Sequence, residues 1–292
     1  MPNSISDLRA AVAAATTPTE RANALNQLAA ELERQSYYTE SLAAAEEAYQ
    51  FAQQAEAPAA EAAALRWQGV VHLRRGKYSE ALRLLEGSQN LYDTIGDRSG
   101  VARVTGIIGN VYTLLGQYGK GLEYFARAMA LLEELGERDE VARVTGNIGN
   151  VYERLGEYVK SLEYYTRAIS LHEELGARNE VAIVTGNIGN VYQYLGEYGN
   201  SLEYFARAIA LYSHESGLRQ NPRCHSRESG NPYHTRLSRV SQTNLRRVYM
   251  KNLATVPALP LLLTASARST LRKSSPTTTL PKPKTSSSKP SR

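Results

Sequence analysis

The chain has 292 residues, 42% of them hydrophobic and 22% charged, which is typical of a globular protein and excludes a wholly disordered one. Its single cysteine, Cys224, excludes an intramolecular disulfide and argues against a thiolate zinc site. No stretch approaches the roughly 18 apolar residues of a membrane-spanning helix. The N-terminus also lacks the basic start and apolar run of a signal peptide, so we expect a cytoplasmic protein without a membrane span.

The net charge of +5 hides a sharp division of the chain. Residues 1–212 carry 19 Lys and Arg against 27 Asp and Glu, a net charge of −8. Residues 213–292 carry 15 against 2, a net charge of +13. Such an asymmetry indicates a boundary near residue 212.

The first element in chain order is a short alanine-rich helix predicted over residues 5–15. We expect residues 1–20 to form an N-terminal capping helix. Such a helix would cover the apolar face at the open end of the array of repeats that begins near residue 21.

A repeat of 40 residues dominates the next part of the chain. Residues 101–140 and 141–180 are identical at 27 of 40 positions, and a third copy begins at residue 181. Degraded copies precede them in the same register, with tyrosines at Tyr38 and Tyr78. Self-similarity at a fixed period predicts a repeat architecture. The predicted units are 21–60, 61–100, 101–140, 141–180 and 181–212.

Each unit has the pattern of a helical hairpin. In the unit at 141–180, apolar residues recur at three- and four-residue steps, which predicts two amphipathic helices. Gly156 and Gly176 follow these stripes at positions where a left-handed residue ends a helix. Gly149, Ser161 and Ala168 are small at the points where the two helices should cross closely. The fold is therefore predicted to be all-α.

The hairpin pattern resembles the tetratricopeptide repeat family, through Ile148, Gly149, Tyr152, Gly156, Tyr158, Ser161, Tyr165 and Ala168. Thr145 replaces the family's usual aromatic residue, and Glu173 its common closing proline. The 40-residue period resembles the long-repeat subclass of the spindle scaffolds LGN and Pins and of many bacterial signalling proteins. The resemblance covers about residues 21–212. It implies a right-handed superhelical solenoid of about five hairpins with a concave groove.

The resemblance also implies a set of groove residues. In the family, the first helix of each hairpin lines the groove, and the asparagine after the glycine bonds a peptide backbone. The corresponding residues are Asn110, Asn150 and Asn190. One helical turn earlier lie Asn147 and Asn187, and a further turn back lie Arg103 and Arg143. An alternative interpretation is that these side chains only bond neighbouring helices or water.

Other patterns favour structural explanations. Tyrosines at fixed repeat offsets are expected to be core and inter-repeat packing, namely Tyr112, Tyr152, Tyr192, Tyr124, Tyr164 and Tyr204. The pairs Glu133–Glu134 and Glu173–Glu174 are expected to be solvated helix faces. The glycines of TGNIGN lack the lysine and the strand of a phosphate loop. No catalytic set or cofactor motif is visible, so we expect neither an enzyme nor a cofactor.

Residues 213–292 contain 23 Ser and Thr and 8 of the 11 prolines, which predicts a disordered basic tail. Residues 237–253 have a loose apolar pattern, which predicts a helix that covers the last repeat. His214, Cys224, His225 and His234 match no metal-ligand spacing. The segment His225–Pro232 resembles a peptide translated from dispersed inverted-repeat elements of bacterial genomes, so the tail is alternatively a non-native reading frame.

The sequence leads to a non-catalytic protein–protein interaction scaffold that binds an extended peptide or a partner helix in its groove. The alternative is a truncated sensory or regulatory module of a larger bacterial signalling enzyme, such as a cyclase or kinase, by family analogy alone. Nucleic-acid binding is disfavoured and would involve only the basic tail. The sequence leaves the oligomeric state and the partner open.

Overall fold

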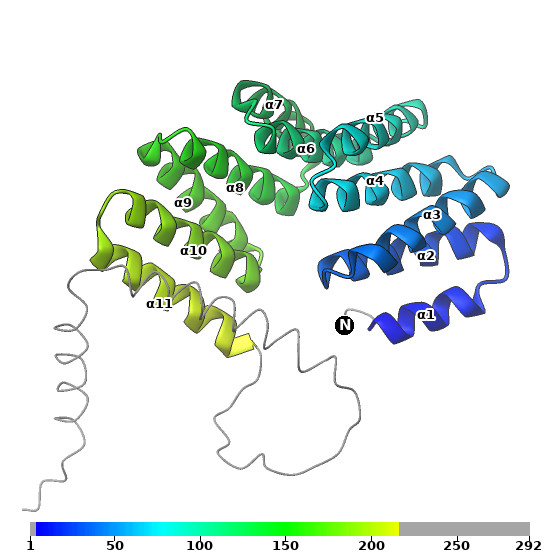
Figure 1. Cartoon of the computed structure of the whole chain (residues 1–292), viewed down its shortest axis with the longest axis horizontal. Coiled ribbons are helices and arrows are strands. Elements are labelled where there is room, and N and C mark those ends of the chain that lie inside the picture. Colours follow the sequence, from blue (N-terminus) through cyan, green and yellow to red (C-terminus); the bar gives the residue numbers. More distant parts are fainter. Residues whose placement is uncertain (1–3, 216–292) are drawn as a thin grey trace, which may run out of the picture. The chain divides into compact units, whose positions relative to one another are not determined.

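The computed structural model describes residues 4–215, which form eleven helices and no strands. Figure 1 shows the helices following one another in chain order. They are α1 Ile5–Ala14, α2 Pro18–Arg34, α3 Tyr38–Gln54, α4 Pro58–Arg74, α5 Tyr78–Thr94, α6 Arg98–Leu114, α7 Tyr118–Leu135, α8 Arg138–Arg154, α9 Tyr158–Glu174, α10 Arg178–Tyr194 and α11 Tyr198–Glu215. The prediction of an all-α solenoid is confirmed.

The helices after α1 pair into five hairpins, α2 with α3 through α10 with α11. The first helices of neighbouring hairpins touch one another, whereas each second helix mainly touches the first helices before and after it. Neighbouring hairpins are therefore closer on the side of their first helices, and that side is concave.

From α2 onward, turns with one left-handed residue join the helices every 20 residues. Gly156 has φ of 75° and Gly176 of 68°, a left-handed conformation that glycine adopts without a steric penalty. After α8, the Gly156 N–H donates to the Glu153 carbonyl at 3.0 Å and the Glu157 N–H to the Tyr152 carbonyl at 2.9 Å. This is the Schellman pattern of helix ends, and the predicted role of both glycines is confirmed.

The helix bounds differ slightly from the predicted unit bounds. The first helices α4, α6, α8 and α10 begin three residues before the predicted unit starts, and α11 continues to Glu215. The unit boundaries themselves remain a prediction. The basic tail beyond residue 215 lies outside the described residues. It includes Cys224, His225, His234 and the segment 237–253, so the two interpretations of the tail stay predictions.

In the second to fifth hairpins the two helices cross closely because the first helix carries a glycine at the crossing. A Cβ atom placed on Gly149 would lie 2.7 Å from the ring of Tyr165. Ser161 and Ala168 are fully buried at the same crossing, and Ser161 Oγ donates to the Gly149 carbonyl at 3.0 Å. The expectation that these small residues allow the crossing is confirmed.

The N-terminal helix α1 begins with a capping box, in which Ser4 Oγ accepts from the Asp7 N–H and the Asp7 carboxylate accepts from the Ser4 N–H. Leu8 of α1 is buried in one cluster with Leu25 and Leu28 of α2. The helix therefore covers apolar side chains of the first hairpin.

The tyrosine rows pack between the two helices of one hairpin. The ring centroids are 5.2 Å apart for Tyr112–Tyr124, 5.4 Å for Tyr152–Tyr164 and 5.3 Å for Tyr192–Tyr204. A packing role is confirmed, and it lies within each hairpin.

The two glutamate pairs are exposed, as expected for solvated helix faces, and each glutamate also forms an ion pair with an arginine. Glu133 and Glu173 pair with Arg167 and Arg207 of the following hairpin, each at 3.4 Å. Their neighbours Glu134 and Glu174 pair with arginines at the start of the same hairpin. The arginines are displaced by 34 or 36 residues, so only the stacked structure brings them close. Each such exposed pair contributes about 0–1 kcal/mol.

His172 gives the solenoid a predicted pH dependence. Burial within α9 lowers the pKa of His172, although Glu180 and Asp139 oppose this effect. An unfolded histidine has a pKa of about 6.5, so the unfolded state binds more protons below that pH. Stability is then complete above about pH 6.5 and falls with decreasing pH, by at most about 1.4 kcal/mol per pH unit for this residue.

The variant His172→Leu should remove this pH-dependent part of the free energy of unfolding, because leucine does not titrate. Leucine fits the site, since Leu132 is fully buried at the same position of the preceding repeat. Urea unfolding at pH 7.5 and pH 5 measures the free energy of unfolding of both proteins. We expect the variant to gain stability relative to the unmodified protein as the pH falls. An equal difference at both pH values would contradict the assignment to His172.

Candidate functional site

An open cavity of about 990 Å³ lies on the concave side of the hairpins. Its walls come from the first helices α2, α4, α6, α8 and α10, with Tyr158 added from α9. The apolar faces of these helices point into the core, so their remaining half-exposed side chains face this groove.

All seven residues predicted from the sequence line the groove: Asn110, Asn150, Asn190, Asn147, Asn187, Arg103 and Arg143. The 40-residue repeat places them on α6, α8 and α10, which are neighbours in the stack. The structure thus brings them together, and their binding of a ligand remains a prediction.

Asn150 is held by a hydrogen-bond network. Tyr165 Oη lies 2.6 Å from both Asn150 Oδ1 and Glu153 Oε2, and its single proton is shared between these acceptors. Asn187 Nδ2 donates to the same Asn150 oxygen at 3.2 Å. Burial and the Glu153 carboxylate raise the pKa of Tyr165, so its hydroxyl stays protonated. The oxygen of Asn150 is therefore occupied, which leaves its NH₂ group to donate elsewhere.

The other carboxamides are differently placed. Asn110, Asn147 and Asn190 are half-buried, and their side chains form no hydrogen bond with any described residue. A carboxamide offers two donor hydrogens and an acceptor oxygen. These three side chains can therefore bond the N–H and C=O groups of a chain lying in the groove.

The two predicted arginines are partly neutralised by α8 and by the residue that precedes it. Arg103 donates to Glu137 at 3.0 Å and lies 3.5 Å from Glu140, and Arg143 donates to the same Glu140. Burial lowers the pKa of Arg103, but the neighbouring carboxylates outweigh it and raise the pKa above its usual value. Arg103 thus bonds the neighbouring hairpin, as the alternative interpretation expects, whereas Arg143 bonds a residue of its own helix.

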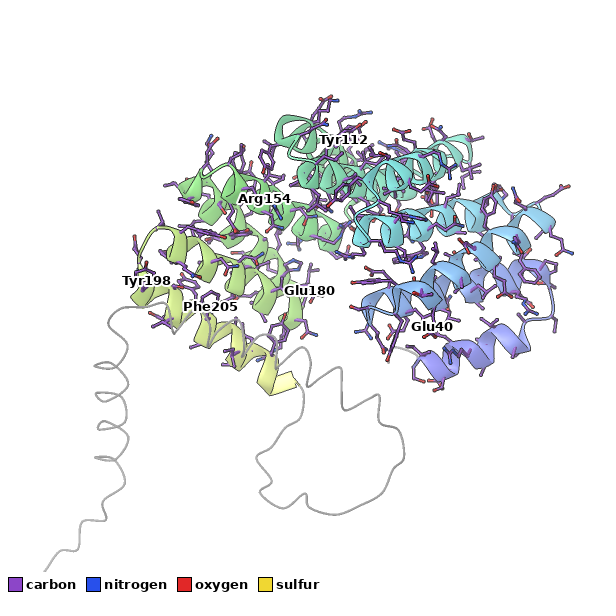
Figure 2. The ribbon with its side chains drawn as sticks, viewed as in Figure 1. Glu40, Tyr112, Arg154, Glu180, Tyr198 and Phe205 are labelled. Carbon is purple, nitrogen blue, oxygen red and sulfur yellow. The ribbon has the colours of Figure 1, made fainter. Side chains whose placement is uncertain are left out.

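Sequence reasoning missed several groove residues, including Arg66, Trp67, Leu114, Arg154 and Tyr194. Arg154, labelled in Figure 2, is the last residue of α8. The signal for them was present in the 40-residue register, since Trp67 aligns with Asn147, and Leu114 aligns with Arg154 and Tyr194. They were overlooked because only recurring residue types were considered.

The groove offers hydrogen-bonding groups and charged side chains to a ligand. Within residues 4–215, no group of three or more His, Cys, Asp or Glu side chains could hold a metal ion. None of the helices in this range provides an apolar stretch able to cross a lipid bilayer.

Many solved structures share this fold, including the following three. The structure of BtubC from P. vanneervenii has a TM-score of 0.58 at 17% identity, covering 78% of this chain and 96% of that one. A Rap protein complexed with Competence and Sporulation Factor has a TM-score of 0.60 at 13% identity, covering 85% and 70%. A signal transduction ATPase with a tetratricopeptide repeat sensor from Pyrococcus horikoshii has a TM-score of 0.51 at 15% identity. There the similarity covers 68% of this chain and only 33% of that one.

No curated protein sequence matches this chain. The tetratricopeptide repeat family model matches it twice, over residues 100–174 and 140–214. These matches begin at the third hairpin and extend to the end of the fifth. With the helical hairpins and their left-handed turns, they show that residues 100–214 consist of tetratricopeptide repeats.

Proposed function

We propose that the chain is a non-catalytic scaffold that binds an extended peptide or partner helix of another protein in its concave groove. The observation that carries this proposal is the row of five asparagine carboxamides from three successive hairpins in one groove. Three of them have no side-chain hydrogen bond to a described residue.

The chemistry of the row suits a peptide backbone. A carboxamide can pair with a backbone N–H or C=O without selecting the side chain beside it. Because Asn150 has its oxygen occupied by Tyr165 and Asn187, it would donate to a ligand carbonyl. Asn110 and Asn190 on either side can donate or accept, so a strand crossing the groove meets complementary groups at each hairpin.

A structural neighbour supports a binding role for this fold. The similar Rap protein was solved as a complex with Competence and Sporulation Factor. A partner of the present chain would meet a concave helical surface that is lined by asparagines and arginines of this chain.

The proposal is tested by selecting 12-residue peptides from a random phage-displayed library with the full chain. Fluorescence anisotropy then measures the affinity of the best peptide for the variant Asn110→Ala/Asn150→Ala/Asn190→Ala. Each lost hydrogen bond is worth about 0.5–1.5 kcal/mol, so the triple variant should bind roughly a hundredfold more weakly.

The matched control is Asn90→Ala/Asn179→Ala/Asn200→Ala, since these three asparagines are exposed and do not line the groove. Circular dichroism checks that both triple variants remain helical. Unchanged affinity in the groove variant, with its helices intact, would refute the role of the asparagine row.

A second candidate is that the chain acts as a sensory or regulatory module of a larger signalling enzyme. It is favoured by the fold shared with the sensor-bearing ATPase of Pyrococcus horikoshii, of which this chain matches only a third. If this candidate is correct, the DNA downstream of codon 212 encodes an enzyme domain in another reading frame. A downstream DNA sequence without such a domain would refute the candidate.

A further inference from the structure

The groove has two chemically different ends. On α4 and α6, Trp67, Val70, Ile107 and Leu114 line it with apolar surface. On α8 and α10, asparagines stand at the positions of Trp67, Val70 and Ile107, and the position of Leu114 is taken by Arg154 and Tyr194. The repeats are close copies in their packing, so this difference concerns only the surface that faces a ligand.

The apolar end is open to a ligand. Leu114 is 43% exposed although it faces the groove. Trp67 and Ile107 are half-buried, and each packs on its own core cluster from below. The guanidinium of Arg66 lies 4.3 Å from the centre of the Trp67 ring. An apolar ligand side chain placed against Leu114 and Ile107 would remove exposed hydrocarbon from water.

The charge of the groove is positive, with five arginines against three glutamates. All three carboxylates already have partners. Glu33 accepts from Arg74 at 2.7 Å, Glu140 lies between two arginines, and Glu153 accepts from Tyr165. Arg154 by contrast is exposed and has no ion pair among the described side chains.

The charge of the groove and of the rest of the chain indicates which class of ligand binds in the groove. Residues 1–212 carry a net charge of −8, so a positive groove is a local departure from the rest of the solenoid. The chain's own segment 213–292 carries a net charge of +13, which has the same sign as the charge of this groove. An acidic segment of another protein is attracted to it.

We propose that the ligand is an extended acidic segment of a partner protein. It places an apolar side chain on Leu114 and Ile107 and a carboxylate side chain beside Arg154. The groove asparagines of α6, α8 and α10 hold its backbone. This inference rests on the proposed function, because it names the class of peptide that the same groove selects.

The test uses an array of immobilised 12-residue peptides with randomised backgrounds and two fixed features. One half of each peptide carries either a Leu or a Ser, and the other half carries either two Glu or two Lys residues. Each combination is made with the Leu or Ser in the N-terminal half and again with it in the C-terminal half. Labelled full-length protein is applied at several concentrations. We expect the Leu and Glu combination to bind roughly tenfold more tightly than either the Leu and Lys or the Ser and Glu combination.

Two single variants separate the anchors. Arg154→Gln should abolish the preference for Glu over Lys while keeping the preference for Leu over Ser. Leu114→Gln should have the opposite effect. Both side chains are exposed at the end of a helix, so neither change disturbs the core. The controls Arg178→Gln and Leu135→Gln alter exposed residues that do not line the groove, and they should leave both preferences unchanged.

The outcomes are distinct. If peptides bind through the asparagine row but Lys-containing and Glu-containing peptides bind equally, the acidic ligand is refuted and the proposed function stands. If Arg154→Gln leaves the preference for Glu over Lys intact, the acidic ligand is likewise refuted while the proposed function stands. If the unmodified protein binds none of the peptides, the proposed function and this inference both fail.

Discussion

Replacing Gly149 with leucine is expected to split the unfolding of the solenoid into two transitions. The new Cβ atom would lie 2.7 Å from the ring of Tyr165, closer than side chains approach, and the larger leucine has no room beyond it. Overpacking a filled core costs about 3 kcal/mol or more in such a case. Because each hairpin contacts only its neighbours, a destabilised fourth hairpin uncouples the hairpins before it from the one after it.

Urea unfolding followed by circular dichroism measures this effect. The control is Gly186→Ala in α10, where an added Cβ meets no heavy atom within 4 Å. Alanine is a better helix former than glycine, so this control should gain about 0.5–1 kcal/mol. A single transition for Gly149→Leu, at the midpoint of the unmodified protein, would show that α8 and α9 do not cross as described.

Truncating Tyr165 to alanine is expected to have a comparably large effect. The side chain is fully buried between Gly149 and the core of the fourth and fifth hairpins. Removing a buried aromatic ring costs about 3–5 kcal/mol, because the cavity that it leaves collapses only partly. The change also releases the oxygen of Asn150 from its hydroxyl partner.

The variant Tyr165→Phe separates these two roles. Phe125 is fully buried at the same position of the third hairpin, so phenylalanine fits and only the hydroxyl is lost. We expect a loss of about 1 kcal/mol in stability and a measurable change in peptide affinity, read by urea unfolding and anisotropy. If the two Tyr165 variants lost equal stability, the ring would not be packed as the structure describes.

The fold was largely predictable because its information is local and repeated. Apolar residues at three- and four-residue steps indicate the helices, and Gly156 and Gly176 mark their ends within the same 40 residues. Gly149 could also be assigned to a close crossing, since a glycine inside an apolar helical stripe usually serves packing. Repetition over several copies made each of these patterns stronger than it is in one hairpin.

The site was predictable as a set of positions but not as a network. Asn150 receives its hydrogen bonds from Tyr165 and Asn187, which lie 15 and 37 residues away. The partners of Arg103 are 34 and 37 residues along the chain. The distances in space between these side chains depend on how far each hairpin is rotated and shifted relative to the preceding hairpin. No local sequence pattern encodes this rotation and shift.

The apolar end of the groove was missed for a different reason. Trp67 and Leu114 depart from the residues that recur at their positions, so a search for recurrence passes over them. A ligand is selected by such departures, because identical repeats would present the same surface to every part of it. Aligning the repeats and then looking for differences is the more informative procedure in a solenoid.

The most direct test of the groove is the nuclear magnetic resonance signal of the asparagine side-chain NH₂ groups during titration with a selected peptide. If a peptide lies along the first helices, the signals of Asn110, Asn150 and Asn190 shift in a saturable manner, while those of Asn90 and Asn179 stay in place. Saturable shifts confined to residues of the second helices, with the groove asparagines unchanged, would contradict the account.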